Sequence, residues 1–235
     1  MSRLSATLRL DAQLQARNKV YLIIAVAALG LAYPLRALFT PEQLRFFMPL
    51  VALSGVSLTT FFLVGVLLLL ERGEGTLDVV LVSPLRPAEY LASKLLTVTA
   101  LALVEAALIA GVAYGLGFSL PWLVLAVLLR SGLVAAVGVA VGVRYRSITD
   151  FLFPAIGLTL AFDLPVLFYL ELWPSPLFYL WPTLPSLLLA KAAFLPVDPL
   201  QLVYACVYGA LAVGAAVFWA SRALDRFVVR GELGS

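Results

Sequence analysis

Six long apolar stretches follow one another along the chain, and charged residues or clusters of proline and glycine separate them. A helix of roughly 20 mostly apolar residues spans the hydrocarbon core of a bilayer, and each stretch is about that long. The sequence therefore predicts an all-α membrane protein with six transmembrane helices. They cover residues 20–38, 46–70, 95–117, 122–143, 151–170 and 200–220.

Residues 1–19 are too polar to span a membrane and lack the charged start, apolar middle and small-residue cleavage site of a signal peptide. On a helix their leucines would face acyl chains while their charged residues meet headgroups and water, which predicts an interfacial amphipathic helix. A frayed tail leading into the first span is the alternative. The leucines are Leu4, Leu8, Leu10 and Leu14, and the charged residues are Arg3, Arg9, Asp11, Arg17 and Lys19.

Composition agrees with a membrane protein. Hydrophobic residues make up 63% of the 235 residues and charged residues 12%, and the mean hydropathy is +1.05. Soluble domains run about 45–50% apolar and about 25% charged, so a water-soluble fold is excluded. The chain has no His and a single Cys, Cys206, which excludes His-dependent catalysis, an intrachain disulfide and a Cys-cluster metal site. No catalytic or metal-binding residue is predicted.

The basic residues predict the orientation, because Lys and Arg are retained on the cytoplasmic side of a membrane. Of the 16 Lys and Arg residues, Arg36, Arg45 and Lys191 fall on the opposite side from the N-terminus and Arg130 falls inside a span, so the remaining 12 share the N-terminal side. We expect a multi-pass protein of the cell inner (plasma) membrane with both termini cytoplasmic. The net charge of +3 reflects this topology and predicts no nucleic-acid partner.

The connection over residues 71–94 is the longest one on the cytoplasmic side and contains its own helix signals. Thr76 follows a Gly-x-Gly hinge and can cap a short helix over residues 77–82, which Asp78 in the first turn favours through the helix dipole. The Ser83-Pro84 dipeptide ends this helix, because a residue before proline is displaced from the helical region.

This short helix is apolar almost all round although it lies in a cytoplasmic loop. An interfacial helix that faces lipid usually carries Lys or Arg on its polar side, whereas this one offers Asp78 alone. Docking into the groove of a soluble partner protein is therefore the favoured interpretation. Burial against the chain's own helices is the alternative.

The loop sequence resembles that of a known family. The string Glu71-Arg72-x-x-Gly75-Thr76-Leu77-x-x-x-Leu81-x-Ser83-Pro84-Leu85, followed by Glu89-Tyr90 and Lys94, is similar to the region after the second span of type-2 ABC exporter permeases. The order of elements resembles that family over nearly the whole chain, and the short chain resembles its fluoroquinolone exporters. The resemblance implies a coupling helix that inserts into a separate ATP-binding subunit. The residues implied in this coupling are Glu71, Gly75, Thr76, Leu77, Asp78, Leu81, Ser83 and Pro84.

The resemblance also implies the partners. No G-x-x-x-x-G-K-[ST] motif occurs in the sequence, so ATP and Mg are expected on a partner ABC ATPase and not on this chain, which binds no cofactor itself. A second permease copy, as a homodimer or a related heterodimer, is implied as well. Residues 171–195, rich in proline and aromatic residues, turn back near the outer interface, and the resemblance places a short re-entrant helical hairpin there. Residues 20–230 then form one transmembrane domain, and 231–235 are a tail with no assigned role.

Three ionisable residues fall inside the predicted spans: Glu105, Arg130 and Asp163. Each costs roughly 2.5–3.5 kcal/mol at the centre of a membrane helix. Glu105 and Arg130 reach similar depth on neighbouring antiparallel helices, which predicts a buried ion pair between them. The favoured role of this pair is a brace between the two helices, and the alternative is a polar element that lines a substrate path. Pro165 predicts a kink beside Asp163. Asp163 is the alternative partner of Arg130, and without a partner it would face a wet cavity and select cationic substrates.

Two glycine pairs at a spacing of four residues, Gly111 with Gly115 and Gly138 with Gly142, predict close helix packing, either inside the chain or between two copies.

With the resemblance, the predicted function is ATP-driven export of a hydrophobic or amphipathic compound such as a drug. The alternatives are a haem or polysaccharide export permease of the same architecture or, in a different class, a membrane-embedded lipid-modifying enzyme. The absence of His disfavours haem.

Overall fold

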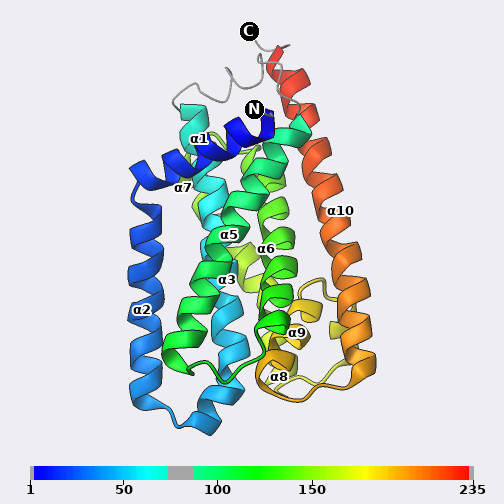
Figure 1. Ribbon diagram of the computed structural model, residues 1–235. Helices are drawn as coiled ribbons and strands as arrows, with labels where there is room; N and C mark the ends of the chain where they lie inside the picture. The colour runs from blue at the N-terminus through cyan, green and yellow to red at the C-terminus, as the bar shows by residue number, and fades with distance from the viewer. Residues whose placement is uncertain (1–2, 74–86, 233–235) are drawn as a thin grey trace.

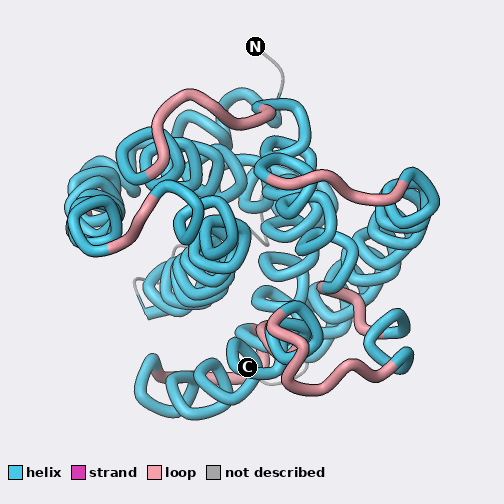
Figure 2. Tube along the Cα trace, turned by 90° about the horizontal axis from the view of Figure 1, so that it is seen from below, coloured by secondary structure: helices cyan, strands magenta, loops and turns pink. Residues whose placement is uncertain are grey.

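The computed structural model describes residues 3–73 and 87–232. Within these ranges the chain is helical, and its helices are joined by short loops and turns (Figure 1; Figure 2). The elements are α1 (Arg3–Arg17), α2 (Val20–Leu38), α3 (Pro41–Gly73), α5 (Pro87–Ala113), α6 (Leu120–Gly142), α7 (Ile148–Phe162), α8 (Pro165–Tyr169), the 3-10 helix η1 (Pro176–Leu180), α9 (Leu184–Phe194) and α10 (Pro199–Glu232).

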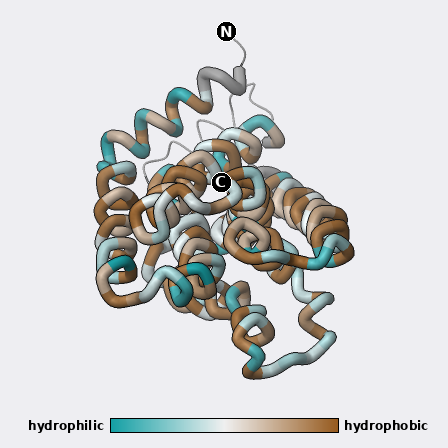
Figure 3. Tube along the Cα trace, turned by 60° about the horizontal axis from the view of Figure 1, so that its bottom comes forward, coloured by the Kyte–Doolittle hydropathy of each residue, from teal (hydrophilic) through white to brown (hydrophobic). Residues whose placement is uncertain are grey.

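The prediction of an all-α protein with six membrane-spanning helices is confirmed in the described part of the chain. The six helices that are long and apolar enough to cross a membrane are Val20–Leu38, Pro41–Gly73, Ala88–Ala113, Leu120–Gly142, Ile148–Tyr169 and Pro199–Arg226. Brown, hydrophobic residues dominate their shafts, while α1 mixes hydrophilic and hydrophobic residues along its length (Figure 3).

The second spanning helix begins five residues earlier than the apolar pattern predicts, at Pro41 and not at residue 46. Thr40 and Gln43 form a reciprocal capping box: the Gln43 N–H donates to Thr40 Oγ1 (3.3 Å) and the Thr40 N–H donates to Gln43 Oε1 (2.9 Å). Pro41 fits the first helical position, where its missing N–H costs no helix bond. Glu42 and Arg45 interrupt the apolar run, so hydropathy alone misses this turn of helix.

Helix α6 lies at the centre of the bundle and packs against α3, α5, α9 and α10. Gly138 allows it to approach α3 closely, because a Cβ built there would lie 2.4 Å from Val64 Cγ1. Gly142 likewise faces Gly65, with 3.7 Å between the built Cβ and the Gly65 Cα. This glycine pair therefore serves packing inside the chain. A Cβ at Gly111 meets nothing within 4 Å, so the other pair makes no such contact.

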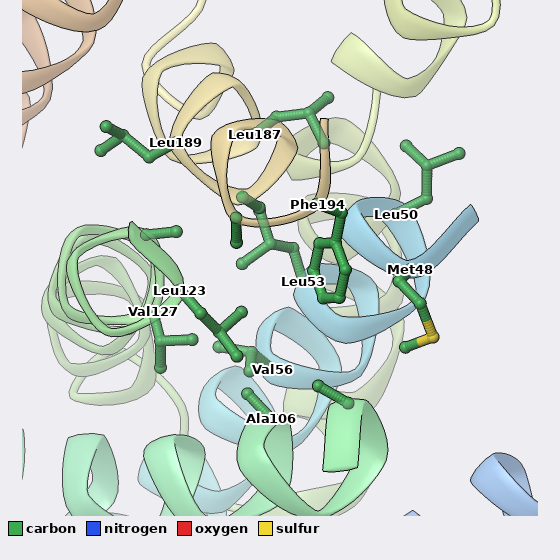
Figure 4. Packing of buried hydrophobic residues seen from close by; sticks show 14 of the residues in the cluster. Met48, Leu50, Leu53, Val56, Ala106, Leu123, Val127, Leu187, Leu189 and Phe194 are labelled. Atoms are coloured by element: carbon green, nitrogen blue, oxygen red, sulfur yellow. The ribbon is translucent and has the colours of Figure 1, made fainter. Parts of the chain in front are cut away.

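Helix α9 is short and almost completely buried. Its 11 residues extend about 16 Å at 1.5 Å per residue, roughly half of the 30 Å hydrocarbon core. Leu187, Leu189 and Phe194 of this helix pack against the apolar side chains of α3 and α6 (Figure 4). Arg45 closes the helix end, since its Nε donates to the Phe194 carbonyl oxygen at 2.6 Å. The segment is compatible with the predicted re-entrant hairpin.

The fifth spanning helix is interrupted at Asp163, as Pro165 predicts, and continues as α8. The interruption leaves carbonyl groups without their usual helix donors. Trp181 Nε1 donates to the Ala161 carbonyl at 3.0 Å, and Thr183 Oγ1 donates to the Phe162 carbonyl at 2.6 Å. The proline- and aromatic-rich segment thus donates hydrogen bonds to carbonyl groups at the interruption. Backbone polar groups at membrane depth require such partners.

Candidate functional site

The predicted coupling helix, residues 77–82, lies outside the described residues, and of the predicted coupling residues the structure describes one. Glu71 lies near the end of α3 and is described, whereas Gly75, Thr76, Leu77, Asp78, Leu81, Ser83 and Pro84 lie outside the described residues. The site can therefore be built from the two helix ends that flank this segment, α3 ending at Gly73 and α5 beginning at Pro87.

A buried group of polar residues joins these two helix ends to α1. We call it the Lys94 cluster; it consists of Asp11, Glu71, Tyr90, Ser93 and Lys94. The Lys94 ammonium forms ion pairs with the carboxylates of Asp11 and Glu71. The Ser93 hydroxyl donates to Asp11 Oδ2 at 2.5 Å, and the Tyr90 hydroxyl donates to Glu71 Oε2 at 2.6 Å. Every member is less than 10% exposed, so this is a core network.

The Lys94 cluster holds three elements together: α1 through Asp11, α3 through Glu71 and α5 through the other three residues. α1 lies across the ends of the upright helices at this point (Figure 1). The expectation that Asp11 faces headgroups and water is wrong, since its side chain is buried. The physical reason is that Lys94 sits inside the apolar body of α5, where a buried cation requires counter-charges.

Arg130 pairs with Asp163 and not with Glu105, so the predicted Glu105–Arg130 ion pair is wrong and the alternative partner is the correct one. The Arg130 Nε also donates to Ser57 Oγ at 2.5 Å. Glu105 instead accepts a hydrogen bond from Thr59 Oγ1 at 2.9 Å. Residues two apart on a helix point about 200° apart, so Ser57 and Thr59 lie on opposite sides of α3. This helix stands between the two charged groups.

The Arg130–Asp163 pair lies at the interruption between α7 and α8, beside a cavity of about 10 Å³. The Arg130 side chain is buried and the Asp163 side chain is 23% exposed. The pair joins α6, α7 and, through Ser57, α3. Because Asp163 has this partner, the condition under which it would select a cationic substrate is not met.

Glu105 has no cationic partner among the described residues. Its residue is 4% exposed, and its Oε2 has no hydrogen-bond partner in the structure. The carboxyl group fits beside Gly55, where an added Cβ would lie 3.3 Å from Oε1. A buried carboxyl group with one oxygen lacking a hydrogen-bond partner is costly inside a membrane. Among the described intramembrane charged residues, Glu105 is therefore the one that the packing of the helices leaves available to bind another group.

A groove of about 350 Å³ runs between α2 and α3, which contact each other little because α2 packs mainly on α5. Thr59, the hydrogen-bond donor to Glu105, is part of its wall. The wall is otherwise almost entirely apolar. The lining residues are Asn18, Val20, Ile23, Ile24, Thr59, Phe62, Leu63, Val66, Leu67 and Leu70.

Comparison with known proteins decides the family. The model of the fluoroquinolones export permease protein family matches residues 2–232. The chain belongs to this family. Two relatives, the fluoroquinolones export permease proteins of Mycobacterium tuberculosis strains CDC 1551 / Oshkosh and ATCC 25618 / H37Rv, are each 37% identical over 234 residues, which is 98% of both chains.

Membership in the fluoroquinolones export permease family gives the site its context. This chain is the membrane-spanning permease subunit of an ABC-type exporter. The family implies an ABC ATPase partner and a membrane setting, and the transporter subunit is not itself the ATPase. The six apolar helices belong to a multi-pass membrane protein.

Sequence reasoning did not assign a structural role to Lys94, Tyr90, Ser93, Ser57 or Thr59 in this permease. Lys94 served only as a topology marker and as part of the loop string. The available signal was its place at the start of an apolar helix, because a charge there must find a partner. Its partner Asp11 lies 83 residues away, and no local pattern indicates such a contact.

Proposed function

We propose that this permease exports an amphipathic drug-like compound, that a partner ATPase supplies the ATP and Mg, and that the compound is recognised at the α2–α3 groove beside Glu105. The observation that carries the proposal is this juxtaposition, through Thr59, of a largely apolar groove with a buried acid that has no cationic partner among the described residues. Its relatives are named as fluoroquinolones export permeases, which favours a drug over haem or a polysaccharide.

Substrate selection follows from the chemistry of the groove. Apolar walls accept the aromatic or aliphatic body of a compound by burying it from water. A protonated amine that displaces the Thr59 hydroxyl reaches the carboxylate of Glu105 and offsets its burial. Amphipathic cations are therefore the preferred class, with neutral compounds of equal size bound less tightly.

Coupling runs through the segment between α3 and α5. The residues Gly75 to Pro84 contact the ATPase in this proposal, and the Lys94 cluster supports it because both helices that flank the segment end in that cluster. A displacement of the segment is passed to α1 and to the spanning helices together. Glu71 is engaged by Lys94 and Tyr90, so it braces the segment and serves neither metal nor phosphate chemistry.

Two copies of the permease complete the transport path in this proposal, either as a homodimer or with a related permease. The α2 surface is apolar and exposed, with Leu22, Ile23 and Val26 each about 60% exposed, which leaves a face for lipid or a second copy. In this proposal both termini lie on the cytoplasmic side of the inner membrane. The clustering of basic residues near α1 and the end of α10 supports this placement.

The test uses inside-out vesicles that contain the permease and its ATPase. ATP-dependent uptake of a fluorescent amphipathic cation is compared with uptake of a neutral analogue of the same size. We expect Glu105→Gln to lower uptake of the cation at least tenfold while uptake of the neutral compound changes less than twofold. Leu81→Asp, which places a charge in the coupling segment, should abolish both. Absence of any ATP-dependent uptake by the unaltered complex would refute export itself, and equal effects of Glu105→Gln on both compounds would refute the selectivity.

A further inference from the structure

A pocket of about 590 Å³ lies between the end of α6 and the last turns of α10, far from the α2–α3 groove in the sequence and lined by different elements. Three of its lining residues are arginines, and none of its described lining residues is acidic. The lining residues are Val143, Arg144, Phe218, Trp219, Arg222, Ala223 and Arg226.

Two of the three arginines lie over aromatic rings. The Arg222 guanidinium lies 4.3 Å from the centroid of the Phe218 ring, and that of Arg144 lies 5.8 Å from the Trp219 ring. Such stacking holds a guanidinium group in place while its N–H donors stay available. Within the described part of the chain none of the three arginines forms an ion pair, so no described residue neutralises the positive charge of the pocket.

An apolar stripe leads from this pocket along α10. Apolar residues at spacings of three, four and seven, on one side of the helix, are more than half exposed, and this helix is the least buried of the six spanning helices. Seen in Figure 1, α10 forms one side of the bundle and its last turns lie at the same end as α1. The stripe consists of Leu200, Val203, Val207, Leu211 and Phe218.

We propose that this pocket binds the phosphate headgroup of an anionic phospholipid, with the acyl chains of the lipid lying along the half of the α10 stripe next to the pocket, Phe218, Leu211 and Val207. Three guanidinium groups match a phosphodiester, since arginine donates two parallel hydrogen bonds to phosphate oxygens. Trp219 and Phe218 occupy the level where aromatic side chains meet headgroups. Basic pockets between spanning helices on the cytoplasmic side hold anionic lipids in this way.

The occupant is a lipid and not a free anion or a protein, because the stripe continues the pocket in the direction of the hydrocarbon core. A free phosphate would use the arginines and leave the stripe unexplained. An acidic protein segment would likewise cover the arginines and leave five exposed apolar side chains on the spanning part of α10. A phospholipid contacts the arginines and the adjoining half of the stripe at once.

Trp219 provides the probe for the test. The chain has four Trp residues, and the difference in quenching between the unaltered permease and Trp219→Phe isolates its fluorescence. The full-length permease is placed in phosphatidylcholine nanodiscs that contain a small equal fraction of brominated phosphatidylglycerol or brominated phosphatidylcholine. We expect the brominated anionic lipid to quench Trp219 several-fold more strongly.

Variants then assign the preference to the pocket. A surface charge attracts an anionic lipid about fivefold per arginine, so Arg222→Gln should lower the preference by about that factor. The triple variant with Arg144→Gln and Arg226→Gln should remove it. Arg146→Gln is the matched control, since Arg146 is an exposed arginine two residues from Arg144 that does not line the pocket. All three arginines are exposed, so the substitutions should not disturb folding, and gel filtration checks this. If the triple variant does not fold, the lipid preference of the single variant Arg222→Gln tests the proposal.

Several outcomes overturn the proposal. Equal quenching by the two brominated lipids would show that Trp219 has no anionic lipid beside it. An equal loss in Arg146→Gln would reduce the effect to general surface charge. Suppression of the preference by glycerol phosphate would identify a free-phosphate site. Loss of quenching on adding the ATPase subunit would identify the pocket as a protein contact.

Discussion

The buried ion pairs of the Lys94 cluster allow the effect of a substitution on the free energy of unfolding to be predicted. Lys94→Met keeps most of the side-chain volume and removes the charge, so two buried carboxylates, those of Asp11 and Glu71, lose their cation. Removing one partner of a buried ion pair costs about 3–5 kcal/mol. We expect Lys94→Met to lower the free energy of unfolding by about this amount, measured by titration with sodium dodecyl sulfate in mixed micelles.

A double variant separates charge from packing. Asp11→Asn removes one of the two stranded carboxylates and leaves the hydrogen bond from Ser93 possible. In the Lys94→Met background this second change should therefore recover part of the lost stability, whereas by itself it should cost about 1–2 kcal/mol.

The control is Lys191→Met, the same substitution at a lysine that lies over the Tyr169 ring and forms no ion pair within the described residues. It should cost less than about 1 kcal/mol. The reasoning is refuted if Lys94→Met costs no more than this control, or if the effects of Lys94→Met and Asp11→Asn simply add.

Two further predictions concern helix packing and the central ion pair. Gly138→Ala should destabilise the permease by about 1–3 kcal/mol, because the new Cβ lies 2.4 Å from the stiff, β-branched Val64; Gly111→Ala, which meets nothing within 4 Å, should change stability by less than about 0.5 kcal/mol in the same titration. Arg130→Asp and Asp163→Arg should each reduce the yield of folded permease on gel filtration, and the double variant should restore part of it; a double variant that is worse than both single variants would argue against direct pairing.

The apolar pattern predicts the number of spanning helices because hydrocarbon imposes length and composition on each helix separately. It does not predict the partners of charged residues, because depth along the membrane normal says nothing about the direction in which a side chain points. Glu105 and Arg130 illustrate this: they were matched by depth, yet α3 separates them, with Thr59 and Ser57 on its opposite sides. Asp11 shows the same limit, since amphipathicity places it at the water while the Lys94 ammonium draws it inward.

Local signals were available at the helix ends. The Thr40-x-x-Gln43 pattern marks the start of α3 and shows that capping chemistry corrects a boundary drawn from hydropathy alone. Pro165 likewise gave the interruption of the fifth span correctly, because the missing N–H is a property of that residue by itself. The acceptors that this interruption exposes could not be matched to Trp181 and Thr183 from sequence, since that pairing depends on how the outer segment folds back.

The two hydrogen bonds from Trp181 and Thr183 to the Ala161 and Phe162 carbonyls set a condition on how the outer end of the permease opens. Separating the segment from α7 in a dry environment would break both bonds. The Ala161 carbonyl would keep its bond from the Leu164 N–H, whereas the Phe162 carbonyl would lose its Thr183 donor, at a cost of about 1–3 kcal/mol. Solvent that enters from the outer side removes this cost by hydrating the Phe162 carbonyl. In the proposed export cycle, separation of this segment from α7 is therefore least costly when water enters at the same time, which would release a departing compound into water.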